Sequence, residues 1–149
     1  MIFVSFNQKS FMKQFYPLLL LMLLVVGCSK SDSVDPITER SSYLVSNASS
    51  VGKWRLTSLK SGATNLALTA TQSVYTKRYT TDNKFSDTDG LVGTWSMPSA
   101  DQLVEVFTNF SSGVSVTQVY KINSVTATQL NLTYTVNGTE INAIYTASM

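Results

Sequence analysis

Over the last two thirds of the chain, apolar and polar residues alternate with a period of two, and this alternation limits the fold more than any other feature. In the clearest stretch, residues 129–136, Leu130 and Leu132 alternate with Asn131 and Thr133. A helix would repeat its apolar positions every three or four residues, whereas successive side chains of a strand point to opposite faces. The chain therefore predicts a domain built from β-strands.

Eight strands are predicted, rich in Thr, Val and Tyr and joined mostly by short turns. They are residues 53–59, 73–80, 84–87, 91–97, 102–108, 114–123, 129–136 and 139–147. Asn137-Gly138 is the strongest turn signal, because a type I′ hairpin turn needs a positive φ at both central positions. Only the connection 61–71 is long. We expect an all-β, eight-stranded antiparallel up-and-down barrel; a two-sheet sandwich, which would need longer crossovers, is the alternative.

The first 28 residues differ in composition from the rest of the chain. Lys9 and Lys13 lie in a segment without acids, and residues 18–26 form an unbroken apolar run. These nine residues are too few to span a bilayer, which takes about 20. They fit the apolar core of a secretory signal, which has about 7–15 residues. Met12 followed by Lys13 already begins a complete signal, so Met12 is an alternative start of the chain.

The apolar run ends in LVVGC at residues 24–28, which resembles the lipobox of bacterial lipoproteins. In that family the signal is removed before the cysteine, and the cysteine carries the lipid. The resemblance implies a signal peptide over residues 1–28, a membrane anchor on Cys28, and a place on the outer membrane of the cell envelope, facing the periplasm or the surface. The alternative is an ordinary signal in which Cys28 stands by chance. Since Cys28 is the only cysteine, no intramolecular disulfide is expected.

Residues 29–50 have the composition of a flexible tether. They are rich in Ser, Asp and Asn and contain little apolar material before residue 43. Residues 43–49 are a candidate for a short helix leading into the domain. The predicted organisation is a signal peptide over 1–28, a tether over 29–50 and a barrel domain over 51–149.

Gly52-Lys53-Trp54 at the start of the first strand resembles the Gly-x-Trp signature of lipocalins and related barrels, whose tryptophan packs across the closed end. Four pieces follow in the order and spacing of the bacterial lipocalin-like domain lipoproteins: GKWRLTS at 52–58, YTTDNKF at 79–85, GTW at 93–95 and LNL at 130–132. The resemblance covers residues 52 to 147 and implies a barrel that binds a small molecule. The Thr-Asp-Tyr segment and the disulfide of other lipocalins are missing, so their particular ligands are not carried over.

Ionisable residues offer little catalytic chemistry. The chain has no histidine, which removes the commonest general base and most zinc sites. Acids in predicted turns, where side chains cap the backbone, are Asp82, Asp89 and Asp101. Glu105 and Glu140 alternate with apolar neighbours and are expected to face outward, and Asp87 with Asp89 supplies too few oxygens for a calcium site. We expect no enzymatic activity, no metal and no cofactor.

Charge gives no sign of a nucleic-acid partner. The chain has 11 Lys and Arg against 9 Asp and Glu. Two of the lysines, Lys9 and Lys13, belong to the predicted signal, which leaves 11 − 2 = 9 basic residues against 9 acids. A mature domain without net charge lacks the basic face that nucleic acid requires.

Aromatic side chains on the strands are the remaining candidates for a site. Those expected inside the barrel are Trp54, Tyr75, Tyr79, Trp95, Phe107, Tyr120 and Tyr134. An eight-stranded barrel is either filled by side chains or holds one small ligand. A hollow barrel would bind a small hydrophobic ligand, and a filled one would serve as a structural lipoprotein that binds an envelope protein. Leu66 and Leu68 in the long connection are candidates for a lid, a plug or an extra strand at the open end.

Replacing Cys28 with serine removes the thiol that the lipid would modify. We expect Cys28→Ser to leave the domain folded but to move it from the membrane fraction to the soluble fraction, or to leave it as unprocessed precursor. Each buried CH₂ of an acyl chain contributes about 0.8 kcal/mol to membrane binding. Cell fractionation with immunoblotting measures the change, with Ser29→Ala as the matched control. Membrane retention of correctly cleaved Cys28→Ser protein would contradict the lipoprotein assignment.

Overall fold

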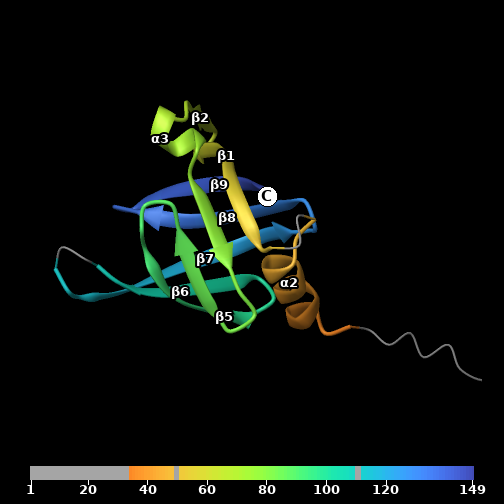
Figure 1. The fold of residues 1–149 in the computed structure, drawn as a ribbon. Coiled ribbons are helices and arrows are strands. Elements are labelled where there is room, and N and C mark those ends of the chain that lie inside the picture. The colour runs from red at the N-terminus through yellow and green to blue at the C-terminus, as the bar shows by residue number, and fades with distance from the viewer. Residues whose placement is uncertain (1–33, 49–50, 110–111) are drawn as a thin grey trace, which may run out of the picture. The chain divides into compact units, whose positions relative to one another are not determined.

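The computed structural model describes residues 34–48, 51–109 and 112–149. Within these residues, a helix precedes a sheet whose first and last strands pair with each other (Figure 1). The predicted signal peptide and Cys28 lie outside the described residues, as do residues 29–33 and 49–50 of the predicted tether.

An eight-stranded antiparallel barrel forms the body of the domain, as predicted. Its strands are β1 (Lys53–Ser61), β3 (Thr76–Tyr79), β4 (Lys84–Asp87), β5 (Val92–Ser99), β6 (Gln102–Thr108), β7 (Ser115–Val125), β8 (Gln129–Val136) and β9 (Thr139–Ala147). Each barrel strand pairs with the next one along the chain. The sheet closes where β9 pairs with β1, from Trp54 opposite Ala147 to Ser61 opposite Ile141. Closure pairs the backbone of the first and last strands, which would otherwise be exposed edges.

The turn between β8 and β9 shows how local sequence fixes the register. Asn137 and Gly138 both have positive φ, 51° and 79°, which confirms the predicted hairpin turn. The pairing then runs without a shift from Val136 opposite Thr139 to Gln129 opposite Thr146.

The long connection after β1 contains two short elements that the alternation does not predict. One is β2 (Thr64–Leu66), which pairs with the last residues of β1. The other is α3 (Ala70–Ser73), a single helical turn. It starts with a capping box, in which the side chains of Thr69 and Gln72 bond each other's backbone N–H groups. Because α3 occupies residues 70–73, the strand predicted over 73–80 starts only at Thr76.

Helix α2 (Pro36–Val45) lies within the predicted tether of residues 29–50 and shows that residues 36–45 are helical rather than flexible. The Asp35 side chain accepts a hydrogen bond from the backbone N–H of Ile37, and Pro36 stands at the first turn, where its missing N–H costs nothing. Leu44 is fully buried, so apolar packing holds the helix that its polar composition did not suggest. Within the described residues, no helix has the length and apolar character needed to cross a bilayer.

Helix α2 covers the end of the barrel at which β1 begins, which is the closed end (Figure 1). Trp54 is fully buried there, and its Nε1–H donates to the carbonyl oxygen of Leu44 at 2.9 Å. Gly52 permits this approach, because it has a φ of +58° and a Cβ at this position would lie 2.4 Å from the carbonyl oxygen of Tyr79. Two of the three positions of the Gly-x-Trp sequence therefore have a direct packing role.

Truncation of Trp54 tests the closed end. We expect Trp54→Ala to lower the free energy of unfolding by about 3–5 kcal/mol, the range for removing a large buried aromatic side chain. Urea denaturation followed by circular dichroism measures the loss, with Val136→Ala on the exposed end of β8 as the control. An unchanged midpoint for Trp54→Ala would contradict the buried position of the tryptophan.

Candidate functional site

A pocket of about 250 Å³ lies inside the barrel at the end opposite α2, which is the open end. Its wall contains four tyrosines, Tyr75, Tyr120, Tyr134 and Tyr145. Leucines complete the apolar part of the wall: Leu56, Leu59 and Leu91. The other polar lining residues are Gln72, Lys77, Asp87 and Asp89.

The strand registers bring these residues together from distant parts of the sequence. Lys77 on β3 lies opposite Asp87 on β4, and directly opposed residues of an antiparallel pair point to the same face. Leu56 on β1 lies opposite Tyr145 on β9 in the closing pair. Closure of the barrel is thus what places Tyr145 in the same wall as the lysine.

A buried ion pair lies beneath the pocket. The ammonium of Lys77 donates to both carboxylate oxygens of Glu105, at 2.8 and 2.7 Å, and the two residues are 5% and 1% exposed. The expectation that Glu105 faces outward is therefore wrong. Both faces of β6 are apolar, with Leu103 inside and Val106 outside, so alternation alone does not tell which face is buried.

Hydrogen bonds around the ion pair are complete. Tyr79 and Tyr120 donate their hydroxyl hydrogens to Glu105, at 2.5 and 3.0 Å, and Lys77 donates its third hydrogen to the Tyr120 oxygen. Burial and the Glu105 carboxylate raise the pKa of Tyr79 well above its usual value, so this hydroxyl remains a donor. The Lys77 hydrogens and the Glu105 oxygens are all used in hydrogen bonds within the cluster, and we assign the cluster a structural role.

Asp87 organises the rim of the pocket. Its Oδ2 accepts from the hydroxyl of Tyr75 at 2.8 Å. Its Oδ1 accepts from the backbone N–H groups of Asp89 and Leu91, at 3.0 and 2.9 Å. One carboxylate thus holds the turn after β4 against the residue that precedes β3.

Two tyrosine hydroxyls in the pocket wall form no hydrogen bond with a protein group in the described part of the chain. Tyr134 and Tyr145 have no hydrogen-bond partner among the described residues, although Tyr145 is only 4% exposed. No completely inaccessible polar side-chain atom in the described part of the chain lacks a partner, so the Tyr145 oxygen is reached from the pocket. Burial raises the pKa of Tyr145, and Tyr134, Glu105 and Asp87 raise it further, which keeps the hydroxyl protonated.

The residues expected inside the barrel divide into two groups. Those in the pocket wall are Tyr75, Tyr120 and Tyr134. Those that lie outside the pocket wall and pack in the core or against it are Trp54, Tyr79, Trp95 and Phe107. The Trp95 indole donates to the carbonyl oxygen of Thr80 at 3.1 Å, and the Phe107 ring packs edge-to-face on Phe85 with centroids 6.0 Å apart. These four side chains fill space that a larger cavity would need.

The two leucines predicted for the open end lie outside the pocket wall. Leu66 is in β2 opposite Leu59 and is 39% exposed, so it forms the extra strand that was one alternative. Leu68 is partly buried against the core. From this part of the chain, Gln72 of α3 is the residue that lines the pocket.

Sequence patterns do not single out Lys77, Asp87 or Tyr145 as site residues. Lys77 looks like an ordinary exposed strand lysine until its partner is known, and that partner lies 28 residues away on a different hairpin. Tyr145 carries the clearest available signal, since it shares the parity of Ala143, which is fully buried on β9.

Comparisons with protein-family models, curated proteins and solved structures give no match for this chain. Among the described residues, no group of three His, Cys, Asp or Glu side chains is placed to hold a metal ion.

Loss of the Glu105 charge tests the buried cluster. We expect Glu105→Gln to cost about 3–5 kcal/mol of stability, because it leaves the ammonium of Lys77 buried without a counter-charge. Glu140→Gln, on the exposed part of β9, removes the same charge and should change stability by less than about 0.5 kcal/mol.

A double variant separates the charge from the packing. Lys77→Met combined with Glu105→Leu removes both charges and should recover part of the loss, since apolar replacements of a buried ion pair are often tolerated. Recovery stays incomplete, because the Tyr79 and Tyr120 hydroxyls lose their acceptor. Chemical denaturation of all three variants gives the comparison. Equal stability of Glu105→Gln and Glu140→Gln would contradict the buried ion pair.

Proposed function

We propose that the protein is a lipid-anchored lipoprotein of the cell envelope, with a lipocalin-like barrel that binds a small ligand at its open end. The Cys28 lipobox and the Gly-x-Trp sequence support the anchor and the family resemblance. The observation that carries ligand binding is the hydroxyl of Tyr145, which faces a pocket and lacks a partner among the described residues. Its oxygen is accessible from the pocket, so a molecule bound there can form a hydrogen bond with it.

The size of the pocket sets the size of the ligand. A cavity of about 150 Å³ holds one benzene molecule, and pockets for drug-sized molecules begin at about 300 Å³. At about 250 Å³, this pocket suits a compound of one ring or of similar bulk. Because the wall mixes tyrosine hydroxyls with leucines, the ligand we propose is amphipathic rather than purely hydrophobic.

The proposal includes no enzymatic activity. Three of the four charged groups that line or support the pocket already serve one another or the backbone: Lys77 with Glu105, and Asp87 with Tyr75 and the following turn. A general base needs a lone pair directed at a substrate proton, and these three groups direct theirs at neighbours. The fourth, Asp89, is an exposed turn residue at the rim.

A second candidate function is a structural lipoprotein that binds an envelope protein through its outer surface. A row of valines on adjacent strands favours it: Val104 on β6 lies opposite Val119 on β7, which is 44% exposed, and Val106 is 38% exposed. Exposed apolar patches on a barrel wall are typical of contact surfaces.

Blocking the pocket distinguishes the two functions. Leu91→Trp places an indole in the pocket wall, whereas Val92→Trp places the same group at an outward position that is 58% exposed. Native mass spectrometry of protein purified from its own envelope should detect a small bound molecule with the unaltered chain and with Val92→Trp, but not with Leu91→Trp. Equal occupancy in both variants, or none with the unaltered chain, would contradict binding in this pocket.

A further inference from the structure

We propose that the pocket at the open end takes a small organic cation, such as a quaternary ammonium compound that also carries a hydroxyl group. This inference rests on the ligand-binding function proposed above and adds the charge of the ligand. Three features carry it: the balance of charge around the pocket, the aromatic faces of its wall, and the hydroxyls that remain available.

The charge around the pocket is negative. Lys77 is its one cation among the lining residues, and Glu105 directly beneath neutralises it at 2.7 Å. Asp87 and Asp89 remain, and neither has an ion pair within the described residues. The neutralised pair and two further carboxylates give a net charge of −2 around a space large enough for one small molecule. A cation entering it gains attraction that a neutral or anionic molecule does not.

Four tyrosine rings line the same space, and aromatic faces attract cations through the ring quadrupole. Tyr120 and Tyr134 stand edge-to-face with ring centroids 5.4 Å apart. The wall already holds one ammonium in this way, because the Lys77 nitrogen lies 4.7 Å from the centroid of the Tyr120 ring. Tyrosines arranged around a space with carboxylates at its rim are the usual environment for an alkylammonium group.

An anion would find no charged donor in the pocket. All three hydrogens of the Lys77 ammonium are taken, two by Glu105 and one by Tyr120. The groups still able to donate are neutral: the side-chain NH2 of Gln72, whose Oε1 accepts from Thr69, and the hydroxyls of Tyr134 and Tyr145. They suit a neutral oxygen of the ligand. A hydroxylated ammonium compound satisfies both the carboxylates and these hydroxyls.

Three probes of nearly the same shape separate charge from size. Choline carries a quaternary nitrogen and a hydroxyl, 3,3-dimethylbutan-1-ol replaces that nitrogen with carbon, and 3,3-dimethylbutanoate is the corresponding anion. Isothermal titration of the full chain in a maltoside detergent should give a Kd for choline about tenfold lower than that for the neutral alcohol. The anion should bind more weakly than either.

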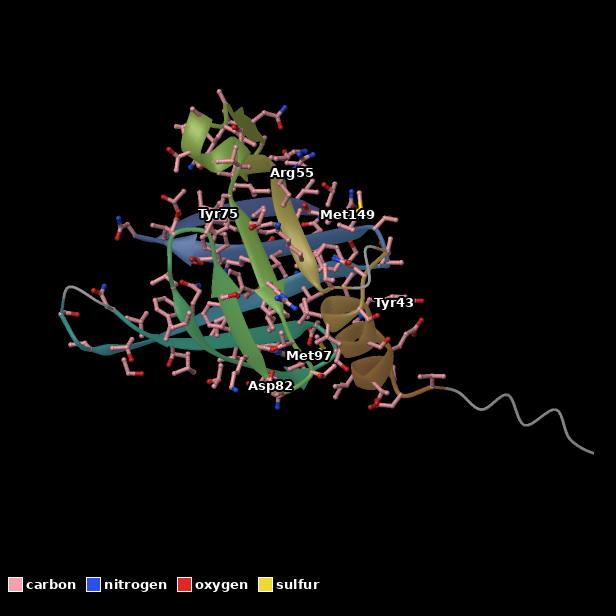
Figure 2. The ribbon with its side chains drawn as sticks, in the orientation of Figure 1. Tyr43, Arg55, Tyr75, Asp82, Met97 and Met149 are labelled. Atoms are coloured by element: carbon pink, nitrogen blue, oxygen red, sulfur yellow. The ribbon has the colours of Figure 1, made fainter. Side chains whose placement is uncertain are left out.

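Variants locate the binding. Tyr134→Phe keeps the aromatic face and should change choline affinity by less than about threefold, whereas Tyr134→Leu removes the face and should weaken it about tenfold. Asp89→Asn removes an exposed carboxylate at the rim and should weaken choline about threefold without affecting the alcohol. Asp82→Asn removes the same charge at the opposite end of β3 from Tyr75 (Figure 2) and should leave both probes unaffected.

The outcomes separate this inference from the function on which it rests. Equal or tighter binding of the neutral alcohol, or preference for the anion, overturns the cation inference and leaves small-molecule binding in place. The same conclusion follows if no probe binds but mass spectrometry finds a bound molecule that is lost in Leu91→Trp. Absence of both probe binding and a bound molecule overturns the two proposals together. Preference for choline that is lost in Tyr134→Leu and reduced in Asp89→Asn supports both.

Discussion

The Lys77–Glu105 ion pair divides the interior of the barrel into two parts. A charge pair taken out of water is stable only when its hydrogen bonds are complete, and here Tyr79 and Tyr120 complete them. Tyr79 comes from the closed half, where it is fully buried beside Trp95, with ring centroids 6.1 Å apart. Tyr120 belongs to the pocket wall. The ion pair therefore lies between the filled, closed half of the barrel and the half that contains the pocket. The positions of Tyr79 in one half and Tyr120 in the other both depend on the geometry of the ion pair.

The closed half depends on contacts between backbone and large side chains at very short range. Gly52 brings the start of β1 so close to Tyr79 and Val45 that no Cβ fits between them. Trp54 then reaches the last turn of α2 and donates to the Leu44 carbonyl, a group that the end of a helix leaves without an internal partner. Helix α2 is thus part of the domain, although its composition of serine, threonine and charged residues resembles a linker.

Sequence patterns predicted the barrel well, because strands and hairpin turns are specified by residues close together in the sequence. Alternation marks the strands, and Asn137-Gly138 fixes one hairpin regardless of the rest of the chain. The site was predicted only in part, since it depends on which residues meet across the closed barrel. Glu105 lies on a strand with two apolar faces, so only Lys77 on a distant strand reveals its orientation. Three tyrosines of the wall, Tyr75, Tyr120 and Tyr134, were predicted because aromatic residues on strands are candidates for the barrel interior. The carboxylate that holds the rim, Asp87, resembles an ordinary turn residue.

The position of the ion pair also limits what the pocket can hold. A long acyl chain entering a barrel must extend toward the closed end, and here it would have to displace Lys77 and Glu105 from each other. Separating them would leave two unpaired charges in an apolar interior, which costs more than the burial of a few methylene groups returns. Compounds that stop above the ion pair avoid this cost. The same cluster that stabilises the fold therefore disfavours long acyl chains in the interior, which agrees with the short ligand proposed for the pocket.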